Sequence, residues 1–379
     1  MLSKVAPLCA IIAIAAAAAT PVSKGVVEPR KLPAEGLYVQ QAPDHLRPYI
    51  LEHFVDTRAV NVSSQIYRFL VTGPSSDDAF TLISTNAPRS DALGVLPHIH
   101  EQHYESFFNY KGRLQLWAQK NGSDDQETRV LTPGDYGSVV RNTTHTFQIL
   151  DPDTELTGVI VPGGFEELFY TLGDNFTSGT DTPYVPAPDE GLAGPDSAAI
   201  SALEGFDVYA QLDFEPRTDL VNDSAPAGST WHSGANALGA VGEPYFIANG
   251  YGPKALNSEF GYQVIQPLTT HDQTQDLNFT ISTISINRKK GNATVPEYIL
   301  TGASAFQVLE GLLSIEIGQY ETVVLSSGDV AFIPPSVAFK YWSDVAFTKV
   351  LYVGKGDDSV DTQLITAGES WDYVTFPVN

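Results

Sequence analysis

The feature that most constrains this chain is the histidine-rich stretch LPHIHEQHYESFFNYKG at Leu96–Gly112. An H-x-H pair is followed after four residues by a carboxylate, and a further histidine comes forty residues after that carboxylate. Side chains two residues apart on a β-strand point to the same face, so His98 and His100 can hold one ion. We expect Glu105 to arrive from the next strand, and His145 from a strand that meets the others only in a folded barrel.

Three imidazoles and one carboxylate form a donor set that suits a divalent transition metal. Copper, iron, nickel, manganese and zinc all accept such ligands, whereas calcium takes oxygen donors. The plainer interpretation, ordinary histidines on polar strands, needs four ligand side chains to coincide at this spacing by accident. We therefore predict a mononuclear metal site formed by His98, His100, Glu105 and His145, and the donors alone leave the metal open.

The rest of the chain predicts short β-strands. Runs rich in Val, Ile, Thr, Tyr and Phe, such as Gln65–Val71 and Thr280–Ile286, are separated by Gly, Pro, Asn and Asp. Helical periodicity is confined to short stretches such as Phe165–Leu172. This pattern is typical of an all-β architecture of sandwiches or barrels with few short helices.

The two halves of the chain repeat one another. Pro97 matches Pro296 and Gly112 matches Gly311, both at a shift of 199 residues. Farther along, Gly134 matches Gly328 after a small change in loop length. The pattern therefore predicts an internal duplication, with two similar β domains.

The second copy lacks the ligand side chains of the first. In this alignment the four ligand positions are occupied by Glu297, Ile299, Ser304 and Phe339. One oxygen ligand among such neighbours does not hold a transition metal. We predict that the second domain is metal-free and that it buries surface against the first, supports a lid or forms a dimer contact.

The metal-ligand motif resembles that of the cupin superfamily, in which a Pro-Gly turn precedes the last histidine. Longer segments, SDALGVLPHIHEQHYESF, GDYGSVVRNTTHTFQI and EPYFIANGYGPKALNS, resemble the secreted fungal quercetin 2,3-dioxygenases over about residues 42–379. This resemblance implies a bicupin, with two β-barrel cupin domains of the jelly-roll type joined by a linker. The expected limits are 37–178 for the metal-binding cupin, 179–205 for the linker and 206–379 for the cupin without a metal site.

The resemblance also implies a reaction and a cofactor. That family cleaves the heterocyclic ring of quercetin with O2, as a flavonol 2,4-dioxygenase, to give a depside and carbon monoxide. It implies one copper ion (Cu²⁺) per chain and Glu105 as the base that takes the flavonol 3-hydroxyl proton. Tyr67 is a candidate hydrogen-bond partner of Glu105. The expected substrate-binding residues are Tyr67, Ile83, Thr85, Phe107, Phe147, Leu156 and Gly158.

Three alternatives stay open at this point. The chain could be another secreted metal-dependent cupin oxygenase, an oxalate-type decarboxylase, or a non-enzymatic storage or binding bicupin. Bicupin oxalate enzymes usually keep ligands in both halves, and storage bicupins often lose both sets. Metal content and the gas released, carbon monoxide or carbon dioxide, would separate these functions. The other histidines, His45, His53, His103, His232 and His271, are expected to be structural, exposed or next to the site rather than ligands.

The N-terminus predicts secretion. Residues 1–20 combine an early lysine, an apolar run and small residues near Thr20, as in a signal peptide. Seven N-x-S/T sequons predict a secreted, extracellular glycoprotein, at Asn61, Asn121, Asn142, Asn175, Asn222, Asn278 and Asn292. A net charge of −24 and a pI near 4.5 argue against nucleic acid or an anionic membrane as partner. A flavonol and O2 are the expected partners, and monomer and homodimer both stay open.

Overall fold

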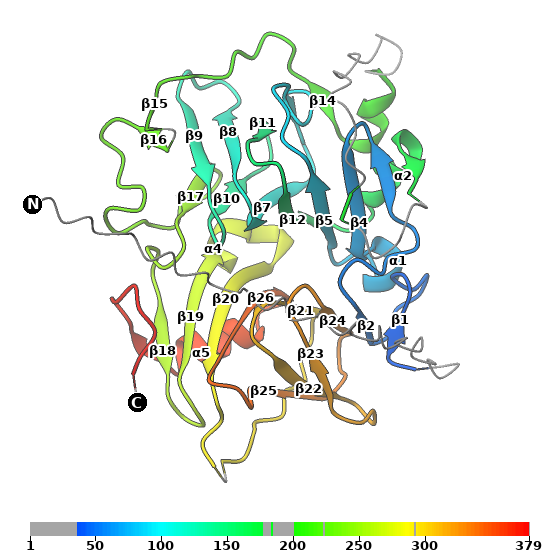
Figure 1. Ribbon diagram of the computed structural model, residues 1–379, viewed down its shortest axis with the longest axis vertical. Helices are drawn as coiled ribbons and strands as arrows, with labels where there is room; N and C mark the ends of the chain where they lie inside the picture. Colours follow the sequence, from blue (N-terminus) through cyan, green and yellow to red (C-terminus); the bar gives the residue numbers. More distant parts are fainter. Residues whose placement is uncertain (1–35, 177–182, 185–200, 223, 292, 379) are drawn as a thin grey trace, which may run out of the picture.

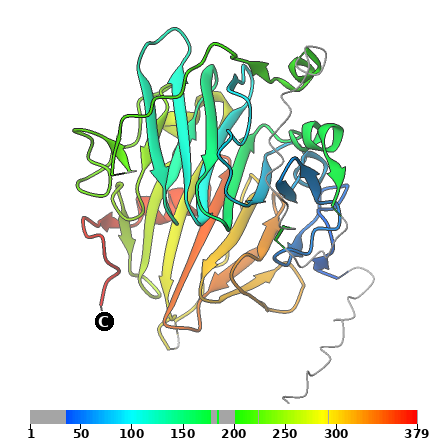
Figure 2. The same ribbon diagram turned by 45° about the horizontal axis from the view of Figure 1, so that its top comes forward.

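The computed structural model of the chain describes residues 36–176, 183–184, 201–222, 224–291 and 293–378. The predicted signal peptide and most of the predicted linker lie outside these residues, as does the sequon at Asn292. Figures 1 and 2 show two layered β domains, one mainly from each half of the chain, stacked on each other. We call them the N-terminal and the C-terminal jelly roll.

The N-terminal jelly roll consists of two facing sheets with apolar side chains between them. Phe107, Leu116 and Phe147, from three different strands, belong to this core. The eight-stranded sheet has the order β13 (Asp174–Asn175), β3 (Val60–Val62), β4 (Gln65–Val71), β5 (Thr81–Ala87), β12 (Thr154–Val161), β7 (Tyr104–Lys111), β10 (Tyr136–Val139), β17 (Tyr245–Ile247). The five-stranded sheet has the order β14 (Tyr209–Ala210), β6 (His98–Ile99), β11 (Thr143–Ile149), β8 (Leu114–Lys120), β9 (Gln126–Leu131).

The C-terminal jelly roll repeats this plan with a fully packed interior. Phe306, Ile315 and Tyr341 are buried in its core. Its nine-stranded sheet has the order β1 (Tyr38–Val39), β2 (Tyr49–Leu51), β24 (Val330–Ile333), β21 (Ser304–Glu310), β26 (Phe347–Lys355), β20 (Phe279–Asn287), β19 (Gln263–Thr269), β18 (Ala255–Asn257), β27 (Glu369–Ser370). The facing sheet has the order β23 (Val323–Leu325), β22 (Leu313–Ile317), β25 (Phe339–Trp342), and a separate small pair is formed by β15 (Leu220–Val221) and β16 (Ala225–Pro226).

The helices of the described residues are short. Thr72 and Thr270 occupy matching positions and each caps the helix that follows with a capping box, so the duplication extends to the helix starts. None of the helices in this part of the chain has the length and apolar character that crossing a membrane requires. The prediction of an all-β fold with few short helices is confirmed. The helices in the described part of the chain include α1 (Gly73–Ser76), α2 (Glu166–Leu172), η1 (Glu204–Phe206), α4 (His271–Thr274), η2 (Gln275–Leu277) and α5 (Val360–Thr366).

Each large sheet includes strands from the other half of the chain, namely β17 in the eight-stranded sheet and β1 with β2 in the nine-stranded sheet. Strand β17 pairs antiparallel with β10 of the N-terminal jelly roll, and β2 pairs antiparallel with β24 of the C-terminal one. The two strands are equivalent in the repeat, so the exchange is reciprocal. The limits 37–178 and 206–379 stay predictions, and strand pairing joins the two jelly rolls across them.

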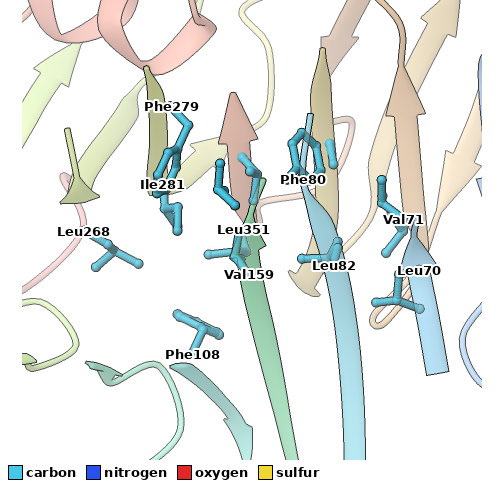
Figure 3. Close-up of a cluster of buried hydrophobic side chains, with 14 of the residues drawn as sticks. Leu70, Val71, Phe80, Leu82, Phe108, Val159, Leu268, Phe279, Ile281 and Leu351 are labelled. Carbon is cyan, nitrogen blue, oxygen red and sulfur yellow. The ribbon is translucent and has the colours of Figure 1, made fainter. Parts of the chain in front are cut away.

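The two large sheets pack face to face and share one apolar cluster (Figure 3). Leu82 and Val159 come from the N-terminal sheet, and Ile281 and Leu351 from the C-terminal sheet. Burying each such side chain contributes roughly 1.5–3 kcal/mol. The C-terminal jelly roll therefore buries surface against the first, which is one of the three roles that the sequence predicts for it.

A candidate metal centre and its cavity

Two sheets of the N-terminal jelly roll supply the four predicted metal-ligand side chains. His98 on β6 lies opposite His145 on β11 in antiparallel register, and His100 follows β6 directly. Glu105 comes from β7 in the facing sheet. The candidate ligand atoms of the four residues all lie within 4.8 Å of one another. The structure thus brings together the set predicted from the sequence.

The second ring nitrogen of each histidine is bound to a backbone carbonyl. The Nδ1 atom of His98 lies 2.7 Å from the Leu96 carbonyl oxygen, and that of His145 lies 3.0 Å from the Thr143 carbonyl oxygen. The Nδ1 atom of His100 lies 2.7 Å from the carbonyl oxygen of Asp207, which is distant in the sequence. Donation from Nδ1 selects one tautomer and orients each ring. Every Nε2 atom is therefore the nitrogen available to a metal.

The Glu105 carboxylate lies among the imidazoles. Its Oε2 atom is 3.1 Å from Nε2 of His100 and 2.9 Å from Nε2 of His145. Burial acts to raise the pKa of Glu105, but these two hydrogen bonds hold it well below its usual range. Burial lowers the pKa of His98, and the Glu105 carboxylate raises the pKa of His100 despite burial. Glu105 is therefore ionised and His98 is neutral near pH 7.

These residues fit a divalent transition metal. Three Nε2 atoms with fixed tautomers and one ionised carboxylate form a nitrogen-rich set of borderline ligands. The side chains are almost fully buried, with Glu105 retaining 14% exposure toward the adjoining cavity. A three-histidine site with one carboxylate can leave a coordination position free for a substrate. The donor set does not distinguish copper from iron, nickel, manganese or zinc.

A cavity of about 500 Å³ adjoins the cluster, and His98 and Glu105 form part of its wall. Most of the other lining side chains are apolar, so the cavity matches the general character of a small-molecule site. All seven residues that the sequence predicted as substrate-binding line this cavity. They are Tyr67, Ile83, Thr85, Phe107, Phe147, Leu156 and Gly158.

Sequence reasoning missed other parts of the cavity wall. Phe165 and Leu168, at the start of α2, line the cavity, and Phe165 also contacts the His100 ring edge to face at 5.1 Å. Leu203, near the end of the predicted linker, and Val208, just after it, add further parts of the wall. The apolar helical run that begins at Phe165 was visible in the sequence. The sequence did not show that this run lies beside the metal ligands, because its position depends on how β12 leads into α2.

One predicted contact near the site differs in the structure, and the place of His103 agrees with one of the two expectations. The Tyr67 hydroxyl donates to Oε1 of Gln65 at 3.3 Å, which is not the expected bond to Glu105. His103 is half-buried and its Nδ1 atom donates to Asp207 at 2.7 Å. It lies next to the ligands and is linked to them through that carboxylate, as one of the sequence interpretations held.

Two further histidines bind buried carboxylates away from the metal centre. His53 contacts Glu155 at 2.9 Å, and His232 contacts Asp135 at 2.9 Å. Glu155 and Asp135 are both almost fully buried. Their roles are therefore structural, in agreement with the sequence interpretation.

Among the described residues of the C-terminal jelly roll there is no matching ligand set, and one part of the sequence alignment needs correction. Phe339 pairs with Tyr298 in the way that His145 pairs with His98. Likewise, Ser336 donates its N–H to the Leu300 carbonyl as Asn142 does to the His100 carbonyl.

The positions of the two ligand histidines are thus taken by Tyr298 and Leu300, and not by Glu297 and Ile299. One extra residue precedes Tyr298, so Glu297 and Ile299 point outward, and Ile299 is 62% exposed. Ser304 and Phe339 are at the expected positions, in register with β24 and β22. The ligand positions therefore hold two aromatic rings, a leucine and a serine, which are packed with the core.

Two proteins of known function with similar sequences are both quercetin 2,3-dioxygenases. The sequence is 58% identical over 346 residues to quercetin 2,3-dioxygenase of Aspergillus japonicus, covering 90% of this chain and 99% of that protein. It is 34% identical over 136 residues to quercetin 2,3-dioxygenase of Bacillus subtilis, covering 36% of this chain and 38% of that protein. No protein-family model matches the chain.

Among solved structures, a variant of the oxalate decarboxylase of Bacillus subtilis has a similar fold. The TM-score is 0.51 at 14% identity, over 84% of this chain and 79% of that one. A second structure of oxalate decarboxylase gives a TM-score of 0.50 at 14% identity, over 85% of this chain and 80% of that one. This likeness concerns the fold alone, and it agrees with the predicted bicupin.

Proposed function

The chain belongs to the quercetin 2,3-dioxygenase family, and from this premise we propose that it opens the heterocyclic ring of a flavonol with O2, giving a depside and carbon monoxide. Identity of 58% across nearly the whole Aspergillus japonicus protein supports the activity. The observation that carries the proposal within this chain is the apolar cavity that ends on His98 and Glu105. A substrate in this cavity would meet a base and a metal site at one point.

A flavonol suits the shape and chemistry of the cavity. Its rings are flat and largely apolar, and pockets for ligands of this size commonly measure about 300–1,000 Å³. Phe107 and Phe147 form aromatic walls, with ring centroids 5.9 Å apart. Gly158 leaves open space beside Ile83, because a Cβ atom there would meet its nearest neighbour only at 4.0 Å. The 3-hydroxyl and the 4-carbonyl of the substrate would face Glu105.

Glu105 acts as the general base in this proposal. A carboxylate oxygen accepts the proton of the flavonol 3-hydroxyl, and the ionised substrate oxygen then becomes a ligand-type group. The Glu105 carboxylate is placed among the ligand imidazoles, with Oε2 at 3.1 Å from Nε2 of His100 and 2.9 Å from Nε2 of His145. The apolar wall excludes water from the deprotonated substrate. When bound by His98, His100, Glu105 and His145, a metal supplies Lewis acidity and one-electron chemistry toward O2, and we propose copper as that metal.

The alternative functions are less well supported by this site. Oxalate is a small, doubly charged substrate, whereas this cavity is lined mainly by Phe, Leu, Ile and Val side chains. A storage or binding bicupin has no need of four converging ligands and a buried ionised carboxylate. The likeness to oxalate decarboxylases therefore reflects the shared fold.

The test is to measure headspace carbon monoxide during aerobic incubation of the metal-assayed protein with quercetin. We expect one carbon monoxide for each quercetin consumed. Consumption without carbon monoxide would replace the ring-cleavage proposal by a different oxidation. No consumption at full copper loading would contradict the flavonol assignment, and release of carbon dioxide from oxalate would establish the decarboxylase instead.

We also propose that the protein is secreted and glycosylated. Four of the sequons lie at exposed asparagines, namely Asn121, Asn142, Asn175 and Asn222. Asn142 is exposed even though His145, three residues later, is fully buried. Asn61 and Asn278 are half-buried. The test is to purify the protein from the culture medium of its own organism and treat it with an N-glycosidase. A decrease in mass would support this proposal, and an unchanged mass would contradict glycosylation.

A further inference from the structure

Asp207 lies far from the metal ligands in sequence and next to them in space. It follows η1 and lies two residues before the start of β14, which pairs with the ligand strand β6. Its φ angle of 62° is in the left-handed region, which aspartate tolerates better than most residues. Its side chain is 5% exposed. A residue of the segment between the two jelly rolls is thus buried against the metal centre.

The Asp207 carboxylate holds the turn that joins His100 to β7. It accepts the backbone N–H groups of Glu101, Gln102 and His103 at 2.9–3.0 Å. It also accepts Nδ1–H of His103 at 2.7 Å. Bonds to an ionised acceptor are about twice as strong as neutral ones. One carboxylate therefore fixes the backbone between two of the metal ligands, His100 and Glu105.

The backbone of the same residue orients the His100 ring. Nδ1–H of His100 donates to the Asp207 carbonyl oxygen at 2.7 Å. His98 and His145 use carbonyl groups only two residues before them in the chain. Only His100, of the three, depends on a carbonyl 107 residues distant. The orientation of that ligand is thus tied to the conformation of Asp207.

We propose that Asp207 is the positioning residue of the metal centre. Its carboxylate sets the turn from His100 to Glu105, and its left-handed backbone aims a carbonyl at His100. Leu203 and Val208, close to Asp207 in the chain, line the substrate cavity, so the same residue also places part of the cavity wall. The inference rests on the metal site of the proposed function.

Two variants remove the Asp207 carboxylate while they allow the left-handed backbone conformation to remain. Asp207→Gly keeps the left-handed conformation freely and removes the carboxylate. Asp207→Asn keeps the size and the conformational preference, but it loses the charge and presents an amide N–H₂ to groups that are themselves donors. Asp329→Asn is the matched control, since Asp329 is a buried turn carboxylate that accepts His53 N–H and Ser326 N–H in the C-terminal jelly roll.

The measurement is the affinity of the purified protein for Cu²⁺ alone, by competition with a chelator, together with the electron paramagnetic resonance spectrum of the bound ion. We expect both Asp207 variants to bind Cu²⁺ about 10- to 100-fold more weakly, with altered spectra, and Asp207→Asn to be the milder. Asp329→Asn should keep the wild-type affinity and spectrum. Wild-type affinity and spectrum in both Asp207 variants would overturn the inference.

Hydrogen exchange on the metal-loaded wild-type protein keeps the inference testable if the variants fail to fold. The amides of Glu101, Gln102 and His103 should be protected, because each donates to Asp207. Fast exchange at all three would overturn the inference. Failure of the proposed function is distinguishable, since the wild-type protein would then bind no Cu²⁺ or release no carbon monoxide from quercetin.

Discussion

Gly94 packs directly against the ring of Phe147, so closely that a Cβ atom on Gly94 would lie 2.2 Å from the ring carbon Cε2. The Gly94 N–H donates to the Phe147 carbonyl at 2.6 Å, and Gln65 donates to the Gly94 carbonyl at 2.5 Å. The glycine is therefore held from both sides and cannot move away from the ring without breaking these bonds. Both residues line the substrate cavity.

Gly94→Ala should displace the Phe147 ring into the cavity and weaken flavonol binding. Overpacking of this kind costs the folded protein about 1–3 kcal/mol. A loss of about 1.4 kcal/mol in substrate binding, caused by the displaced ring, raises KM about tenfold. Because Phe147 does not bind the metal, the copper content should stay unchanged. Steady-state carbon monoxide release across quercetin concentrations measures the effect.

The second substitution Phe147→Leu, added to Gly94→Ala, should return KM toward the value of Phe147→Leu alone, since a smaller side chain relieves the clash. Gly291→Ala is the control, because a Cβ atom there meets nothing within 4 Å. An unchanged KM in Gly94→Ala would show that the ring is free to move elsewhere.

Glu105→Gln should nearly abolish turnover. The amide has the same shape but accepts no proton at neutral pH, and losing a positioned general base lowers kcat by about 10²- to 10⁴-fold. The exposed Glu321→Gln should have normal kcat. Rates are to be compared per bound copper, so that loss of a ligand is not counted as loss of a base. Wild-type turnover per copper in Glu105→Gln would remove Glu105 from the role of base.

His145→Ala and Phe339→Ala probe equivalent positions in the two jelly rolls. Loss of the ligand in His145→Ala should abolish stoichiometric copper binding. Phe339 is almost fully buried, so Phe339→Ala should lower the free energy of unfolding by about 3–5 kcal/mol while copper stays at one ion per chain. Elemental analysis and denaturant unfolding measure the two effects. Phe339→His should bind no second ion, because Tyr298, Leu300 and Ser304 still surround it, and a second bound copper would contradict this description.

The strands and the metal ligands could be predicted because their signals are local. The run Gln65–Val71 is rich in β-branched and aromatic residues, and β4 has those same bounds. The ligand histidines share a short motif whose spacing follows from strand geometry. The duplication could likewise be read from repeated turns, such as those at Gly112 and Gly311, where both glycines have positive φ angles.

Other features depended on contacts between distant segments. Asp207 has no motif around it, and it reaches the ligands only because β14 pairs with β6. The exchanged strands β2 and β17 are three residues long, too short to show which sheet they join. The alignment placed Glu297 instead of Tyr298 at the position of His98, an error of one residue. A single inserted residue reverses which side chains of an extended segment point inward.

The His232–Asp135 pair predicts a pH dependence of stability that is separate from the metal centre. His232 contacts both oxygens of Asp135 at 2.9 and 3.0 Å, and Asp135 is fully buried. The hydrogen bond to Asp135 raises the pKa of His232, against a smaller opposing effect of burial. Asp135 also accepts hydrogen bonds from the backbone N–H groups of Thr132 and Asn249, and the positive charge of Lys349 on β26 attracts it. The carboxylate therefore keeps partners when the histidine is removed.

A pKa raised in the folded state means that protonated His232 stabilises the fold. This contribution is fully present below the unfolded-state pKa of about 6.5 and is lost as the pH rises through the higher folded-state pKa. His232→Gln should therefore lose more stability, relative to the wild-type protein, at about pH 5.5 than at about pH 9. Urea unfolding at both pH values measures the two differences. Equal differences would show that the neutral ring binds Asp135 as well as the charged one, and His232 would then contribute a hydrogen bond without a charge.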